Sequence, residues 1–166
     1  MNVKDSDIRL VKSLLDDYGV AWISAPGEAD ELCAHLMHTN QVYACMSDDM
    51  DMFAYGCVRV FRHFSLVKHT VLFYDLNEIL TDLQMTVQEF RQVIVLSGTD
   101  YNINANTTQN NLFKTIKYFN NYKSFKTDQT FYEWLQEDTN YITNIDLLNK
   151  INIMFDLNEE KENLRV

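Results

Sequence analysis

Short apolar runs alternate along this chain with longer stretches whose apolar residues recur at helical spacing, and this alternation restricts the fold more than any other feature. The runs suited to strands are residues 20–23, 42–46, 58–61 and 70–74. Helical spacing covers residues 5–17, 26–38, 76–83, 87–96, 110–121, 128–137 and 145–155. Strands that alternate with helices predict an α/β fold, in which a mainly parallel sheet is flanked by helices.

The length of 166 residues is enough for one domain with a substantial core. We expect an α/β region over residues 1–101, with residues 102–166 forming a helical C-terminal extension packed on it. No apolar run approaches the roughly 18–20 residues that a bilayer requires, so no membrane association is expected. The three cysteines include no CxxC pair, and the first residues contain no apolar signal core. An intracellular, reducing compartment fits these features.

Acidic residues follow two of the expected strands and recur once later. Pro26 and Gly27 lead to Glu28 and Asp30, the run 42–46 leads to Asp49 and Asp51, and Asp100 stands alone. In parallel sheets, ligands bind beyond the carboxyl ends of the strands, where the first two clusters lie. All-oxygen ligands select hard cations such as Mg²⁺ or Mn²⁺, and two such ions can promote phosphodiester hydrolysis. We therefore expect a metal-binding carboxylate site for phosphodiester cleavage.

Each acidic cluster taken alone has an ordinary explanation. Acids in a first helical turn complement the helix dipole, which suffices for Glu28 and Asp30. Asp49 and Asp51 would suit a solvated turn, and Asp100 a loop or a cap. The net charge of −10 also disfavours a nucleic-acid binder, although bound divalent cations would offset acidic charge. The presence of three clusters in one chain favours the metal site.

Three motifs in order resemble the internal nuclease region of flap endonucleases. They are APGEADELC at residues 25–33, VYACMSDDMDMF at residues 42–53 and LSGTDY at residues 96–101. The resemblance extends over residues 8–121 and includes the xeroderma pigmentosum G type of structure-specific 5′ nuclease. It implies a Rossmann-like PIN-type domain.

The resemblance implies catalytic and metal-binding roles for five residues: Glu28, Asp30, Asp49, Asp51 and Asp100. In the family these acids hold two Mg²⁺ ions, which Mn²⁺ can replace, and the enzymes hydrolyse DNA at 5′ flaps or branched structures in replication and repair. A nuclear location, or sites of viral or cellular DNA replication, would follow. Arg62, Lys114 and Lys117 are candidate contacts to DNA phosphates, and a solvated surface is an equally good explanation for the two lysines.

The chain departs from the family pattern in two places. Family members have an N-terminal region with two further metal-binding aspartates and a helical arch, and this chain starts at the segment after the arch. We therefore expect a fragment, or a split protein that needs a separate N-terminal nuclease segment. Residues 102–109 contain no glycine, whereas the family has a glycine-rich helix–hairpin–helix at this point.

Two other functions remain open. One is a catalytically incomplete domain of the same fold that binds DNA or a partner without cutting. The other is a phosphatase of the haloacid dehalogenase type, which also places a D-x-D motif after a strand. In that class glycine and threonine follow the second aspartate, whereas here Met52 and Phe53 follow Asp51.

Overall fold

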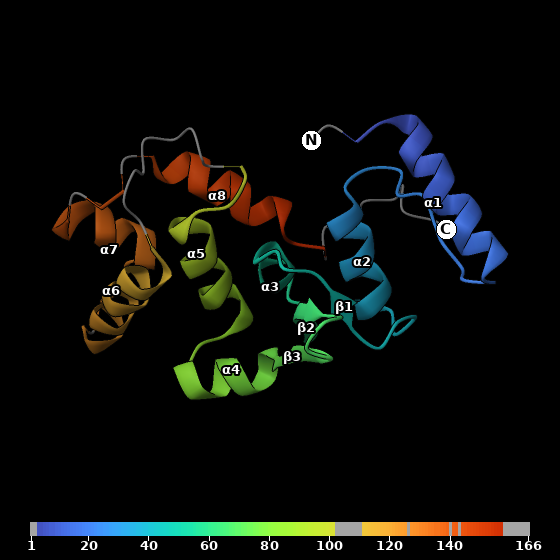
Figure 1. The fold of residues 1–166 in the computed structure, drawn as a ribbon. Coiled ribbons are helices and arrows are strands. Elements are labelled where there is room, and N and C mark those ends of the chain that lie inside the picture. The colour runs from blue at the N-terminus through green and yellow to red at the C-terminus, as the bar shows by residue number, and fades with distance from the viewer. Residues whose placement is uncertain (1–2, 102–110, 126, 140, 143, 158–166) are drawn as a thin grey trace.

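A computed structural model describes residues 3–101, 111–125, 127–139, 141–142 and 144–157 (Figure 1). Each helix expected from the sequence is present, and one short helix, α3, was not expected. The elements in chain order are α1 (Asp5–Asp17), α2 (Ala29–His38), β1 (Cys45–Met46), α3 (Asp51–Ala54), β2 (Arg59–Ser65), β3 (Thr70–Asp75), α4 (Leu76–Leu83), α5 (Val87–Ser97), α6 (Leu112–Ser124), α7 (Phe131–Asp138) and α8 (Ile145–Met154).

Local side-chain caps define where the central helices begin. The Thr86 side chain accepts a hydrogen bond from the Glu89 amide, and the Glu89 carboxylate accepts one from the Thr86 amide at 2.8 Å. This reciprocal capping box satisfies two amides that the helix itself leaves unpaired. Asp75 caps α4 in a similar way, because its carboxylate accepts a hydrogen bond from the Asn77 amide at 2.9 Å.

Thr86→Ala is expected to lower the free energy of unfolding by about 1 kcal/mol, because one end of the capping box is lost. Thr81→Ala is the matched control, since the Thr81 hydroxyl only donates to the Asn77 carbonyl within α4. Urea denaturation of both variants measures the difference. Equal effects of the two substitutions would contradict the capping role.

The sheet of the described residues is small and mixed. Its order is β1-β2-β3, with β1 parallel to β2 and β2 antiparallel to β3. The prediction of a mainly parallel sheet is therefore wrong for this part of the chain. Residues 66–69 join β2 to β3 and are too few for a parallel crossover, which needs about a dozen residues or more, so the two strands form a hairpin.

Two of the expected strands differ from the structure. The run at residues 42–46 forms a ladder only from Cys45, and the Tyr43 carbonyl accepts a hydrogen bond from the Arg59 side chain. Residues 20–23 form no strand, and Val20 and Ile23 are half exposed. This segment follows α1 instead, where the Trp22 indole donates to the Asp16 carboxylate at 2.8 Å. A strand needs a hydrogen-bonded neighbour, and the described residues place none beside this segment.

Helix α5 lies at the centre of the core, with α3, α6 and α8 packed around it (Figure 1). Its residues Val93, Val95 and Leu96 are fully buried, whereas Gln88 in its first turn is exposed. Arg91 is the buried charge in this helix. Its Nε donates to the Ala54 carbonyl at 2.8 Å, and its Nη1 lies 3.6 Å from the Asp156 carboxylate. Arg91 thus joins the end of α3 to the residues after α8.

The expected division after residue 101 stays a prediction, because residues 102–110 lie outside the described part. The expected difference from a helix–hairpin–helix falls on these same residues. Within the described part, no helix has the length and apolar character needed to cross a membrane.

Candidate metal-binding site

The loop of residues 47–51 follows β1 and carries the second acidic cluster. The Ser47 amide continues the β1–β2 pairing by donating to the Phe61 carbonyl at 3.1 Å. The Asp49 amide then donates to the Ser47 hydroxyl at 3.1 Å, and the Asp51 amide donates to the Asp49 carboxylate at 3.0 Å. These bonds turn the chain directly from the strand into α3.

Asp51 is the most buried of the five predicted acids, with only 7% of its surface exposed. Burial is the largest cause that raises the pKa of Asp51, to about 7. The other causes are the negative charges of Asp49, Asp100 and Asp30. The tertiary structure therefore brings acids from three separate segments within electrostatic range of one buried carboxyl.

Asp30 meets the same acids from the first turn of α2. Its pKa is raised by burial and then by the charges of Asp49, Glu28 and Asp100. Glu28 is the exposed residue before α2, and its charge also acts on Tyr101. All five predicted acids thus interact with at least one other predicted acid.

Asp100 follows a sharp turn at the end of α5. Gly98 adopts a φ of 121°, which residues with a Cβ rarely adopt, and Thr99 is buried beside it. An open pocket lies between this turn and the loop after β1, lined by Asp48, Asp49, Met50, Asp51, Gly98, Thr99 and Asp100. Glu28 and Asp30 do not line this pocket.

An aromatic cluster supports the turn that carries Asp100, and the sequence analysis did not identify it. Tyr101 lies near Tyr55, and burial followed by this neighbour raises the pKa of the Tyr55 hydroxyl. The Phe155 ring packs edge-on against both, with centroid distances of 4.8 Å to Tyr55 and 5.7 Å to Tyr101. Phe155 follows α8, and no local sequence signal connects it to residue 101.

The carboxylates supply the right donor type for a hard cation, since all their ligand atoms are oxygens. Their mutual repulsion and the raised pKa of Asp51 are what a divalent charge would relieve. Among the described residues, however, no three His, Cys, Asp or Glu side chains are close enough together to hold one ion. The acids therefore lie within Coulombic range but not at ligand distance from a common point.

The predicted basic contacts lie in different places. The Arg62 guanidinium packs against the loop after β1, where it donates to Met50 and to the Asp48 carbonyl. Lys114 and Lys117 are on α6, which lies across α5 from β1 (Figure 1). The Lys114 ammonium is 4.8 Å from the centre of the Tyr141 ring, and that of Lys117 is 5.8 Å from the Phe113 ring. The structure thus places Arg62 beside the acids and the lysines away from them.

Comparison with known proteins decides the family. Residues 19–100 match the family model of the XPG I-region. The chain carries the XPG I-region of the flap endonuclease and XPG (Rad2) nucleases. The family resemblance read from the three motifs is thereby confirmed.

Relatives of this XPG I-region include flap endonuclease 1-B of Sorghum bicolor, which is 40% identical over 93 residues, covering 54% of this chain and 22% of the relative. The DNA repair protein RAD2 of Saccharomyces cerevisiae is 32% identical over 130 residues, covering 74% of this chain and 13% of that protein. The chain thus spans less than a quarter of the length of either relative.

Solved structures with the same fold include the flap endonuclease-1 of Methanococcus jannaschii, with a TM-score of 0.74 and 21% identity. That match covers 93% of this chain and 44% of the other. The catalytic core of Rad2, solved in complex with DNA substrate, has a TM-score of 0.72 and 24% identity, covering 96% of this chain and 58% of that one. At these identities the likeness concerns the fold.

Proposed function

We propose that this XPG I-region supplies the larger part of the active site of a metal-dependent DNA nuclease. The substrates would be 5′ flaps or other branched DNA formed in replication and repair, in the nucleus or at viral or cellular replication sites. The observation that carries the proposal is that Asp49, Asp51 and Asp100 line one pocket, with Asp30 close enough for its charge to act on Asp51. Mere DNA binding does not require this concentration of negative charge, which opposes the approach of phosphates.

Two Mg²⁺ ions, or Mn²⁺ in their place, are the proposed cofactors, held by Glu28, Asp30, Asp49, Asp51 and Asp100. Such ions, when bound, activate water and stabilise the leaving oxygen of a phosphodiester. The chain's own residues orient the ligands: the bonds at Ser47 fix Asp49, and Gly98 directs the chain toward Asp100.

A further segment with additional carboxylates is proposed to complete the site. The described acids include no three side chains placed to hold one ion, and the flap endonuclease 1-B of Sorghum bicolor is more than four times as long as its part that matches this chain. DNA is the expected second partner, because the Rad2 core and human GEN1 were both solved with DNA. Lys114 and Lys117 are the proposed phosphate contacts, whereas the Arg62 guanidinium already donates to the Asp48 carbonyl and the Met50 sulfur.

Asp49→Ala is expected to abolish Mg²⁺-dependent cleavage of a 5′-flap oligonucleotide by the chain joined to an N-terminal nuclease region. Loss of a ligand should exceed the roughly 10–100-fold that outer-shell partners of a metal site cost. The chain without that region should bind Mn²⁺ weakly, as measured by calorimetric titration, and cut poorly. Circular dichroism should show that the variant remains folded.

Asp82→Ala is the matched control, because Asp82 is an exposed acid on α4 that does not line the acidic pocket. It should leave both cleavage and Mn²⁺ binding unchanged. Full cleavage by the Asp49→Ala variant would rule out the proposed site, as would the absence of Mn²⁺ binding to the joined protein.

The second candidate function is a catalytically incomplete domain of this fold that binds DNA or a partner without cutting. The geometry that favours it is the lack, among the described residues, of three acids at ligand distance from one point. Mn²⁺ binding without any cleavage by the joined protein would select this alternative.

A further inference from the structure

An irregularity in β2 directs two side chains toward the acidic loop. The ladder with β3 pairs Arg62 with Leu72 and next pairs Ser65 with Thr70, so β2 holds one extra residue between these pairs. His63 lies in this bulge with a φ of 53°. Left-handed backbone is unfavourable for a residue with a Cβ, and bulges commonly redirect side chains next to functional sites.

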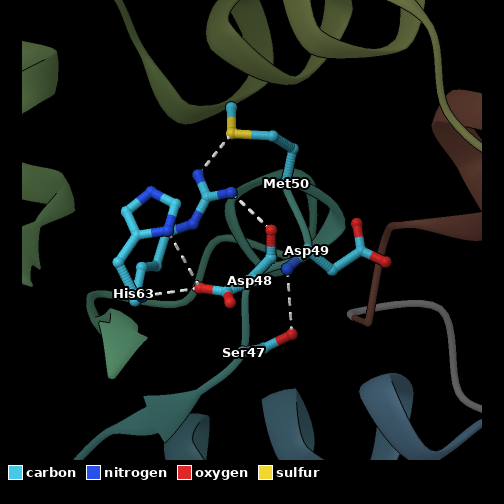
Figure 2. Close-up of polar contacts among 6 residues, drawn as sticks. Ser47, Asp48, Asp49, Met50 and His63 are labelled. Atoms are coloured by element: carbon cyan, nitrogen blue, oxygen red, sulfur yellow. Dashed lines mark hydrogen bonds and ion pairs between the residues drawn. The ribbon is translucent and has the colours of Figure 1, made fainter. Parts of the chain in front are cut away.

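The bulge is tied to the loop through Asp48. The His63 amide donates to the Asp48 carboxylate at 2.6 Å, and the His63 Nδ1 lies 3.5 Å from the same oxygen (Figure 2). Both side chains are more than half exposed, so their ion pair contributes little by itself. The hydrogen bond from the His63 amide contributes more to the structure, because it stabilises the bulged backbone beside the loop.

Arg62 makes the deeper contact with the same loop. Its Nη2 donates to the Asp48 carbonyl and its Nη1 to the Met50 sulfur at 2.8 Å (Figure 2). The guanidinium carbon is 5.9 Å from the centre of the Phe53 ring and 6.0 Å from that of Tyr74. The third nitrogen, Nε, is buried without a partner in the described part of the structure. Two of the three guanidinium nitrogens are thus hydrogen-bonded to the loop.

These contacts hold both ends of the peptide group that joins Asp48 to Asp49. Arg62 binds its carbonyl, and the Ser47 hydroxyl binds its amide at 3.1 Å. Figure 2 shows the Asp49 carboxylate on the side of the loop away from His63. A peptide group held at both ends has little freedom to rotate. The contacts of Arg62 and Ser47 with this peptide group therefore limit the directions that the Asp49 side chain can take.

We propose that Arg62 is a positioning residue, which orients the Asp49–Asp51 loop for cation binding by holding the Asp48–Asp49 peptide. The statement that the loop binds a cation rests on the proposed function, whereas the statement that Arg62 orders the loop does not. A direct DNA contact by Arg62 would instead require the guanidinium to leave the Asp48 carbonyl and the Met50 sulfur.

The test compares Arg62→Met, Arg62→Lys and Arg59→Met. Arg59 is the matched control, since it lies on the same strand but donates to the Tyr43 carbonyl and covers the Tyr43 ring, away from the acidic loop. Amide hydrogen exchange by NMR is measured at Asp49 and Asp51, with Val93 in the core as the reference for global unfolding. Mn²⁺ binding is measured by electron paramagnetic resonance, and affinity for a 5′-flap oligonucleotide by fluorescence anisotropy.

Arg62→Met is expected to accelerate exchange at Asp49 and Asp51 by at least about tenfold relative to Val93, and to weaken Mn²⁺ binding about 10–100-fold. Arg62→Lys should recover part of both losses, because a lysine can reach one acceptor but cannot donate as a fork. Arg59→Met should change neither measurement.

Unchanged exchange at Asp49 and Asp51 in Arg62→Met would overturn the proposal. If DNA binding is weaker while the exchange is unchanged, Arg62 is instead a phosphate contact. If Arg62→Met does not fold, Arg62→Lys decides, since unaltered loop exchange and Mn²⁺ binding in it would equally overturn the proposal. Absence of Mn²⁺ binding by the unsubstituted protein would count against the proposed function, and loop exchange would still decide the role of Arg62.

Discussion

Asp51→Asn is expected to stabilise the chain at neutral pH while weakening its binding of divalent cations. Asp51 is 7% exposed, and burial together with three nearby acids raises the pKa of its carboxyl from 3.8 to about 7. An ionised carboxylate in this position is unfavourable, and an amide of nearly the same shape removes the charge. Since one pKa unit corresponds to about 1.4 kcal/mol, the gain is on the order of 2–4 kcal/mol without metal.

The same substitution should change how stability depends on pH. Because the carboxyl of folded Asp51 has the higher pKa, the folded state binds the proton more tightly than the unfolded state. The favourable contribution of the protonated Asp51 carboxyl to the free energy of unfolding is fully present below about pH 4 and is lost as the pH rises toward about 7. The advantage of Asp51→Asn should therefore be large at pH 8 and small at pH 4.5.

Urea denaturation at pH 4.5 and pH 8, in the presence of a chelator, measures this effect. Asp82→Asn on the exposed side of α4 is the control and should give no such difference. Adding Mn²⁺ at about a hundred times its dissociation constant should stabilise the unsubstituted protein by about 2.7 kcal/mol. The difference in unfolding free energy between this protein and Asp51→Asn should then become smaller. Destabilisation by Asp51→Asn at pH 8 would contradict the assignment of Asp51 as a strained carboxylate.

Phe155→Ala is expected to lower the free energy of unfolding by about 3–5 kcal/mol, because a fully buried aromatic ring is removed. Its edge contacts with Tyr55 and Tyr101 are lost with it, and these join the residue after α8 to the end of α3 and to the residue after Asp100. The turn that carries Asp100 should then be held less firmly, which should weaken Mn²⁺ binding as well.

Phe113→Ala is the control for this prediction, because the Phe113 side chain is 76% exposed and its loss should change stability little. Chemical denaturation compares the two variants, and Phe155→Leu should retain most of the stability by filling most of the space. Similar losses in Phe155→Ala and Phe113→Ala would show that the aromatic cluster contributes nothing of its own.

Helix positions followed from local sequence signals, and the strand predictions were less accurate. Thr86 and Glu89 stand three residues apart before an apolar run, which was enough to locate the start of α5. Residues 20–23 are as apolar as many strands, but a strand exists only where another backbone pairs with it. The hairpin of β2 and β3 could have been predicted from the sequence, since residues 62–69, between the two expected strands, are too few for a crossover.

The sequence by itself determined which acids are present, their order after the expected strands and the family to which their motifs point. Only the tertiary structure decided that Asp51 is buried among three other acids and that Arg62 faces the acidic loop. It also decided that Phe155 supports the turn at residue 101. Local propensities depend on neighbours in the chain, whereas burial, electrostatic range and hydrogen-bond partners depend on segments that meet only after folding.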